Sequence, residues 1–269
     1  MASQDVPSFA YSEAFTPARP RKKRNNRPAR DGPSPSALLQ QTTDELAATE
    51  WTRECRQILR ESLDALGFRC PSVLCLGLGS PSASRDARAQ LAFLLAICDD
   101  IRIDRANVSV YDPVFAAEDV ALLAALGRGR FRAAAPTVAF MPHCDLQLYE
   151  NLLRENWSGA GPHAAADADA GAGLSNLVLI SNRLSDYAES VPARKMSVEH
   201  PCVWRLAPYL VSRNLPACAA YPTAFNNTAV QYARVGDAGE DFWELPPPTD
   251  TSRGGSDEHG CGVAGGGSV

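Results

Sequence analysis

The sequence predicts an α/β fold built on an open parallel sheet with helices on both faces. Four short apolar runs end in glycine, proline or polar residues, and the segments between them carry apolar residues at helical spacing. Continuous apolar runs are typical of strands covered on both faces, and alternating strands and helices are typical of a parallel sheet. Segments rich in Pro, Ser, Arg and Gly are expected to form disordered tails at both ends.

The first predicted elements are a helix over residues 44–66 and a strand over residues 73–76. The apolar residues of the helix share one stripe, and Gly67 follows as a C-terminal cap. The strand runs into a glycine-containing turn, after which residues 83–98 place Ala, Leu and Cys side chains on one helical face. This order is expected of the first strand–helix unit of a parallel sheet.

The second and third predicted strands are Val108–Tyr111 and Thr137–Met141. A short helix over residues 120–126 is expected between them, because a glycine follows its last apolar residue. Pro142 ends the third strand, since proline cannot donate to a sheet ladder. Asp145 then occupies the position of an N-cap, and apolar residues recur at helical spacing behind it.

A fourth strand is predicted over residues 177–180, followed by helices around residues 201–210 and a last strand near residues 216–221. Right-handed crossovers would join these strands into a parallel sheet of order 3-2-1-4-5, counted along the chain. The sequence therefore predicts a Rossmann-like, three-layer α/β/α architecture.

Four segments of this chain resemble one family in their order and intervals. They are GLGSPSASRDARAQLAFLL, VYDPVFAAED, FMPHCDLQLYENLLRENW and LSNLVLISN. The resemblance is to the SRR-like proteins, named for sensitivity to red light reduced, and it extends to Phe225-Asn226-Asn227-Thr228, where the family has Phe-Asn-Asp-Thr. It implies a regulatory domain linked to light signalling, circadian timing and haem metabolism. Asn227 departs from the family's carboxylate.

Composition suggests one such domain with two tails. Residues 1–42 lack periodicity and are expected to be a disordered basic tail, residues 43–245 to form a single SRR-like domain, and residues 246–269 to be a second disordered tail. Residues 158–173 are a low-complexity run of Gly, Ala and Asp and are expected to be an insertion.

The charge distribution is uneven. The chain has a net charge of −5, yet seven of its 26 basic residues lie within residues 19–30, so the remainder is markedly acidic. Specific nucleic-acid binding by such a body is not expected, because phosphate neutralisation supplies most of the affinity for duplexes. The basic run, which contains Arg21-Lys22-Lys23-Arg24, is interpreted as either a nuclear import signal or a solvated tail.

Cysteine usage and hydropathy indicate where the protein acts. None of the eight cysteines forms a CxxC pair, and no apolar run approaches the roughly 20 residues that span a bilayer. We expect reduced thiols in the cytoplasm, the nucleus or both, with no membrane association. With only four histidines, a structural zinc site is not expected.

The turn after the first strand is the first candidate binding site. Gly77, Gly79 and Ser80 approximate a dinucleotide fingerprint, in which backbone amides approach a phosphate at a helix N-terminus. Asp112 ends the second strand, where a carboxylate could accept the ribose hydroxyls of a nucleotide or of S-adenosylmethionine. The alternative is a purely structural turn with a capping carboxylate.

The ends of the third and fourth strands supply His143, Cys144 and Asn182. A thiol near a helix N-terminus can act as a nucleophile, and His or Cys can ligate haem iron. Alternatively, His143 bonds a loop carbonyl and Cys144 is a small buried apolar residue. We expect all seven candidate residues to line one cleft, because the carboxyl ends of parallel strands share an edge.

Two functions remain open from the sequence. The first, which the resemblance implies, is a non-catalytic regulatory protein that binds a small ligand or protein partners. The second is a Rossmann-type enzyme, such as an S-adenosylmethionine-dependent methyltransferase or a nucleotide-dependent enzyme. The candidate ligands are S-adenosylmethionine, a nucleotide and haem.

Overall fold

The computed structural model describes residues 32–69, 71–123, 133–157, 173–236 and 238–246, of which those from Ser34 onward belong to one compact unit. The strands are β1 (Ser72–Leu76), β2 (Val108–Tyr111), β3 (Thr137–Met141), β4 (Leu177–Asn182), β5 (Leu210–Asn214) and β6 (Thr228–Ala233). The α-helices are α1 (Pro35–Ala47), α2 (Glu50–Leu66), α3 (Arg85–Asp100), α4 (Ala117–Leu122), α5 (Leu146–Glu155), α6 (Leu184–Ser190), α7 (Ala193–Glu199) and α8 (Pro201–Leu206). Short 3-10 turns are η1 (Arg105–Asn107), η3 (Leu174–Asn176), η4 (Ala207–Tyr209) and η5 (Glu240–Phe242).

The six strands form one mixed sheet in the order β2-β1-β3-β4-β6-β5. Strands β1 to β4 are parallel, whereas β6 runs antiparallel to both β4 and β5. The three-layer α/β fold and the first four predicted strands are confirmed. The carboxyl ends of β1 and β3 lie side by side at the point where the chain changes direction across the sheet, which is where open α/β sheets bind ligands.

Two details of the predicted sheet are wrong. The order is 2-1-3-4 rather than 3-2-1-4, and the sheet is not wholly parallel. Residues 216–221 form no strand; instead the Pro216 carbonyl accepts a 2.7 Å hydrogen bond from the Trp51 indole on α2. The last strand is β6, whose polar Gln231 is fully buried because both ends of its amide have partners, among them the Leu184 amide and the Ser181 hydroxyl.

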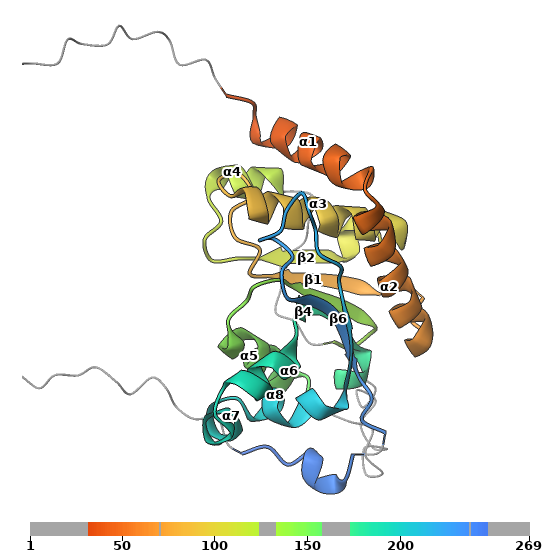
Figure 1. Ribbon diagram of the computed structural model, residues 1–269, viewed down its shortest axis with the longest axis vertical. Helices are drawn as coiled ribbons and strands as arrows, with labels where there is room; N and C mark the ends of the chain where they lie inside the picture. The colour runs from red at the N-terminus through yellow and green to blue at the C-terminus, as the bar shows by residue number, and fades with distance from the viewer. Residues whose placement is uncertain (1–31, 70, 124–132, 158–172, 237, 247–269) are drawn as a thin grey trace, which may run out of the picture. The chain divides into compact units, whose positions relative to one another are not determined.

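Helices cover both faces of the sheet (Figure 1), and an apolar core lies on each face. One core joins α2 and α3 to alternate residues of the strands, including Val73 and Phe140. The other core joins α5, α7 and α8 to the intervening residues of the same strands, including Leu74 and Ala139. This alternation follows from the period of two along a strand, and burial on both faces explains why the strands read as continuous apolar runs.

Helix boundaries differ from the predictions near the N-terminus. The helix expected over residues 44–66 is two helices, because Thr49 caps α2 by accepting the Thr52 amide. Residues 35–42, expected within a disordered tail, belong to α1, which Ser34 caps and Pro35 begins. Gly67 ends α2 in a left-handed conformation, as predicted. The basic run, residues 158–172 of the predicted insertion 158–173 and the tail beyond residue 246 lie outside the described residues.

Helix α4 lies on the same side of the sheet as α1 and α3. Leu122 and Leu123 pack into the core beneath those helices. On the opposite face of β2, Tyr111 is 60% exposed, and in the described part of the chain no helix packs over it. Within the described residues, this side of the sheet is therefore uncovered at the end of β2.

Candidate functional site

The turn after β1 is held by its own backbone amides. Gly77 and Gly79 have φ of 66° and 72°, a left-handed conformation that favours glycine. The Gly77 amide donates to the Tyr111 carbonyl, and the Gly79 amide donates to the Asp112 carboxylate at 2.7 Å. These two amides are therefore already satisfied within the protein, whereas a phosphate site requires amides that point at the ligand.

Asp112 joins the ends of β1 and β2. Its side chain is 8% exposed; one oxygen accepts the Gly79 amide and the other accepts the Val114 amide at 2.9 Å. The carboxylate thus fixes the turn that follows β1 and the loop that follows its own strand. This arrangement matches the structural alternative, in which Asp112 is a capping group.

A second buried carboxylate, Asp119 at the start of α4, was not identified from the sequence. It accepts the Ser82 amide at 2.9 Å and the Ala116 amide at 3.0 Å. Burial opposes its ionisation, but hydrogen bonds from Ser82, Ser80 and Ala116 outweigh this effect and lower the pKa of Asp119. The local signal was an acidic residue in the first turn of a short helix. Ser80 therefore stabilises the turn through its hydrogen bond to Asp119.

Cys144, in the loop after β3, packs against the turn that follows β1. Its side chain is buried and its thiol donates to the Leu76 carbonyl at 3.3 Å. Burial, followed by the nearby charges of Asp145 and Asp112, raises the pKa of Cys144 to about 12. The neutral thiol is therefore the prevailing form at neutral pH, whereas nucleophilic attack and metal ligation need the thiolate.

His143 and Asn182 connect β3 to β4 and to the loop before β6. His143 has φ of 55°, and its backbone amide donates to the Asn182 side-chain oxygen at 3.0 Å. Its ring Nε2 lies 3.1 Å from the Ala224 carbonyl. Asn182 in turn donates to the Tyr187 hydroxyl. The ring is bonded to a loop carbonyl, as the structural interpretation of this residue expects.

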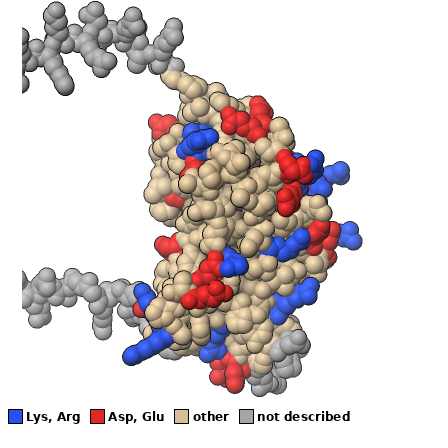
Figure 2. Space-filling view, viewed as in Figure 1, with Lys and Arg blue, Asp and Glu red and all other residues tan. Residues whose placement is uncertain are grey.

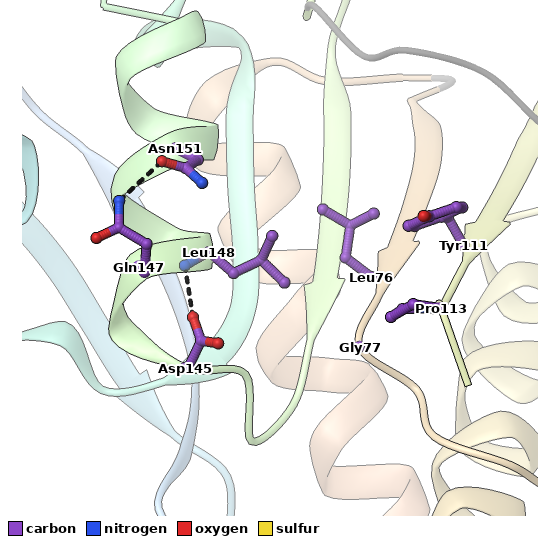
Figure 3. Close-up of a pocket in the computed structure, with 8 residues that line it drawn as sticks. All are labelled: Leu76, Gly77, Tyr111, Pro113, Asp145, Gln147, Leu148 and Asn151. Atoms are coloured by element: carbon purple, nitrogen blue, oxygen red, sulfur yellow. Dashed lines mark hydrogen bonds between the residues drawn. The ribbon is translucent and has the colours of Figure 1, made fainter. Parts of the chain in front are cut away.

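A groove of about 300 Å³ lies beside these turns, between the N-terminal half of α5 and the ends of β1 and β2 (Figure 3). It is lined by Leu76, Gly77, Tyr111, Pro113, Asp145, Gln147, Leu148 and Asn151. Figure 3 shows Leu148 pointing from α5 toward Leu76, with Tyr111 and Pro113 beyond it. Of the seven predicted site residues, only Gly77 lines this groove.

A family model for the SRR1 domain matches residues 55–232, which span β1 to β5 and nearly all of β6. The chain belongs to the SRR1 family. The predicted family resemblance is therefore confirmed.

Curated relatives of this SRR1 domain carry the same family name. The chain is 34% identical over 143 residues to an SRR1-like protein of Mus musculus and 35% identical over 123 residues to the Protein SENSITIVITY TO RED LIGHT REDUCED 1 of Arabidopsis thaliana. These alignments cover 50% and 43% of this chain and 53% and 40% of the two relatives, so the match spans about half of each protein. No solved structure matches the chain.

The structure groups the predicted residues of the SRR1 domain by direct contact. Gly79 bonds Asp112, His143 bonds Asn182, and Cys144 packs against Gly77. That these residues bind a cofactor stays a prediction. Most of the groove was not predicted from the sequence, because its lining comes from the outward face of β2 and from α5. The aromatic residue Tyr111 at the end of the second predicted strand was the available signal, but the predicted order placed that strand inside the sheet, whereas β2 is an edge strand.

The described residues also bear on nucleic-acid, metal and membrane sites. On the face shown in Figure 2, acidic and basic side chains are interspersed, without the continuous basic surface that binds a nucleic-acid backbone. Within the described ranges, no three His, Cys, Asp or Glu side chains are placed to hold a metal ion. No helix in these ranges has the length and apolarity needed to cross a membrane.

Proposed function

We propose that this SRR1 domain is a non-catalytic regulatory module that acts by binding, with the groove beside β1 and β2 as its binding site. The observation that carries this proposal is that polar groups at the carboxyl ends of the strands are already hydrogen-bonded within the protein. The Gly79 amide, the Asp112 carboxylate and the Cys144 thiol all bond other parts of the protein. The groove leaves apolar and amide side chains open to a ligand.

We propose the pathway from the family resemblance. The plant relative is named for sensitivity to red light, and we extend a role in light or circadian signalling to this chain on that basis. A link to haem metabolism is part of the same proposal and rests on the family resemblance. Binding of haem itself is measured in the experiment described below.

A Rossmann-type enzyme remains the second candidate. Two left-handed glycines, Gly77 and Gly79, follow β1 next to the point where the chain changes direction across the sheet, which is the usual place for a nucleotide-dependent site. Their amides are satisfied in this structure, so an enzyme of this class would need the turn to rearrange on binding. This requirement makes the second candidate testable.

The decisive experiment measures ligand-dependent stability and turnover together. The full chain is melted with S-adenosylmethionine, NAD(H), nucleotides or haem, and each ligand is then analysed chemically. A ligand that binds only the folded state stabilises it by about 2.7 kcal/mol at 100 times its dissociation constant. We expect stabilisation with the ligand recovered unchanged. Conversion of any ligand by the wild-type chain would establish the enzyme instead.

We also propose that Arg21-Lys22-Lys23-Arg24 directs the protein to the nucleus. The run has the composition of an import signal. Replacing the four residues by Ala should move a tagged chain from nucleus to cytoplasm without changing its melting temperature. An unchanged distribution would return this run to a solvated tail.

A further inference from the structure

The side chains around the groove divide into an apolar side and a polar side. Leu76, Tyr111, Pro113 and Leu148 provide apolar surface, whereas Asp145, Gln147 and Asn151 on and before α5 provide polar groups. Small-molecule sites typically combine a mostly apolar lining with a few convergent polar groups and have volumes of roughly 300–1,000 Å³. At about 300 Å³, this groove suits a ligand at the small end of that range.

Tyr111 gives the apolar side its most distinctive group. Tyr111 is 60% exposed, and Val114, which directly follows Pro113 in the loop after β2, is 62% exposed. An aromatic ring left open beside a groove is a surface on which another flat ring can stack, and the adjacent Pro113 and Leu76 extend that surface. The ligand that gains most from this arrangement is planar and aromatic.

Two amide side chains on α5 present one acceptor and one donor. Gln147 donates through Nε2 to the Asn151 Oδ1 at 2.9 Å. This bond leaves the Gln147 carbonyl oxygen to accept and the Asn151 amide group to donate. A paired acceptor and donor is the pattern by which Asn and Gln recognise a purine edge. The polar side of the groove thus matches a nitrogen heterocycle.

The charge of the residues that line the groove restricts the class of ligand further. Asp145 is the only charged residue among the eight that line the groove, and one of its oxygens already accepts the Leu148 amide as the N-cap of α5. Among the residues that the structure describes, no lysine or arginine lines the groove. A phosphate placed inside it would meet a carboxylate and no cation, whereas an uncharged base would meet no such opposition.

We infer that the groove binds a planar nitrogen heterocycle of the purine class, as a base or nucleoside without phosphate, held between the ring of Tyr111 and the amides of Gln147 and Asn151. This inference rests on the proposed function, because it names the ligand class of the same groove. It differs from a dinucleotide site, since no phosphate contact and no glycine-turn amide takes part.

The test measures binding of adenosine, guanosine, their 5′-monophosphates and S-adenosylmethionine to the full chain by calorimetry. Three variants accompany the wild type. Tyr111→Ala removes the stacking ring, Tyr111→Phe keeps the ring and removes the hydroxyl, and Val198→Ala changes an exposed residue on α7, outside the groove. Tyr111 and Val198 are both largely exposed, so all three variants are expected to fold.

We expect at least one nucleoside to bind, and to bind no more weakly than its monophosphate. Tyr111→Ala should weaken that binding about tenfold or more, which corresponds to the loss of one stacked ring, while Tyr111→Phe and Val198→Ala bind as the wild type does. Absence of nucleoside binding, a monophosphate that binds tenfold more tightly, or an unchanged affinity in Tyr111→Ala would each overturn the inference.

Hydrogen exchange and chemical analysis of the ligand, added to the calorimetry, separate this inference from the proposed function. If no nucleoside binds but haem or a partner protein protects the backbone amides of α5 and β2 from hydrogen exchange, the ligand class is wrong and the binding function stands. If a nucleoside binds and is converted chemically, the ligand class stands and the non-catalytic function is wrong.

Discussion

The sulfur of Cys144 lies where a side chain at position 77 would have to be. Gly77 has φ of 66°, and an added β-carbon there would overlap Sγ of Cys144. The thiol also donates to the carbonyl of Leu76, the residue before Gly77. The glycine is therefore required for two independent reasons, its backbone conformation and the close approach of the loop that follows β3.

Gly77→Ala should be strongly destabilising. The left-handed conformation costs an L-residue about 1–2 kcal/mol, and overpacking against the thiol adds about 1–3 kcal/mol. In Gly77→Ala/Cys144→Ala the obstruction is removed, so part of the loss should be recovered while the conformational cost remains. Urea unfolding of the full chain, with Cys144→Ala alone as the control, measures both terms. If the double variant were no more stable than the summed effects of the two single changes on the free energy of unfolding predict, the sulfur would not be the obstacle.

Cys144 should be nearly inert in the folded protein. Its pKa is raised to about 12 by burial, and alkylation proceeds through the thiolate. At pH 8, we expect iodoacetamide to label Cys144 at least about a hundredfold more slowly in the native chain than in the urea-unfolded chain. Peptide mapping by mass spectrometry resolves this site from the other cysteines. Rapid labelling in the native state would restore the interpretation of Cys144 as a nucleophile or ligand.

The sequence predicted which residues gather at the edge of the sheet, but not what they do there. Strand ends could be located from apolar runs and the residues that stop them, and parallel strands share their carboxyl edge. The bond between Gly79 and Asp112 joins residues 33 positions apart. No local sequence pattern indicates whether a carboxylate at a strand end accepts hydrogen bonds from the neighbouring turn or is available to a ligand.

The groove could not be predicted because it depends on how helices are distributed between the faces of the sheet. Helix α4 packs on the side of α1, which leaves Tyr111 exposed on the other side. The sequence of α4 carries an apolar stripe but does not indicate which face of the sheet receives it. The strand order was missed for a related reason, since the connection from β2 to β3 passes β1 and nothing in the chain specifies that step.

Asp112→Asn should lower stability by about 1–3 kcal/mol. Both carboxylate oxygens accept backbone amides, from Gly79 and from Val114, and an asparagine would place an NH₂ group against one of these donors. Asp145→Asn is the matched control, because Asp145 accepts the Leu148 amide through one oxygen and asparagine is an equally good N-cap. Urea unfolding compares the two. Equal stability of both variants would argue that Asp112 is free to serve a ligand.

His143→Gly and His143→Ala should differ in stability, although both remove the imidazole. Each loses the contact of the ring with the Ala224 carbonyl, but only alanine retains the cost of φ at 55° for a residue with a β-carbon. That cost is about 1–2 kcal/mol. We expect His143→Gly to be the more stable of the two in thermal unfolding. If alanine were the more stable, the left-handed conformation at this position would not store strain.

Asp119 should make the protein less stable in acid. The pKa of this carboxyl is lowered in the folded state, since the hydrogen bonds from Ser82, Ser80 and Ala116 outweigh the effect of burial. A lowered folded-state pKa means that the unfolded chain takes up the proton first as the pH falls. The contribution of Asp119 is therefore complete above the unfolded pKa of about 3.9 and is lost as the pH falls through the folded value.

Asp119→Asn tests this coupling. At pH 7 the variant should be less stable than the wild type by about 1–3 kcal/mol, because a buried acceptor of two backbone amides is replaced by a group that also donates. The difference should shrink below about pH 4, where the wild type loses the same contribution. Urea unfolding from pH 3 to pH 7 measures it, with Asp64→Asn at the exposed end of α2 as the control. A difference that stays constant across this range would mean that the charge of Asp119 does not stabilise the turn after β1, and that its effect arises from packing alone.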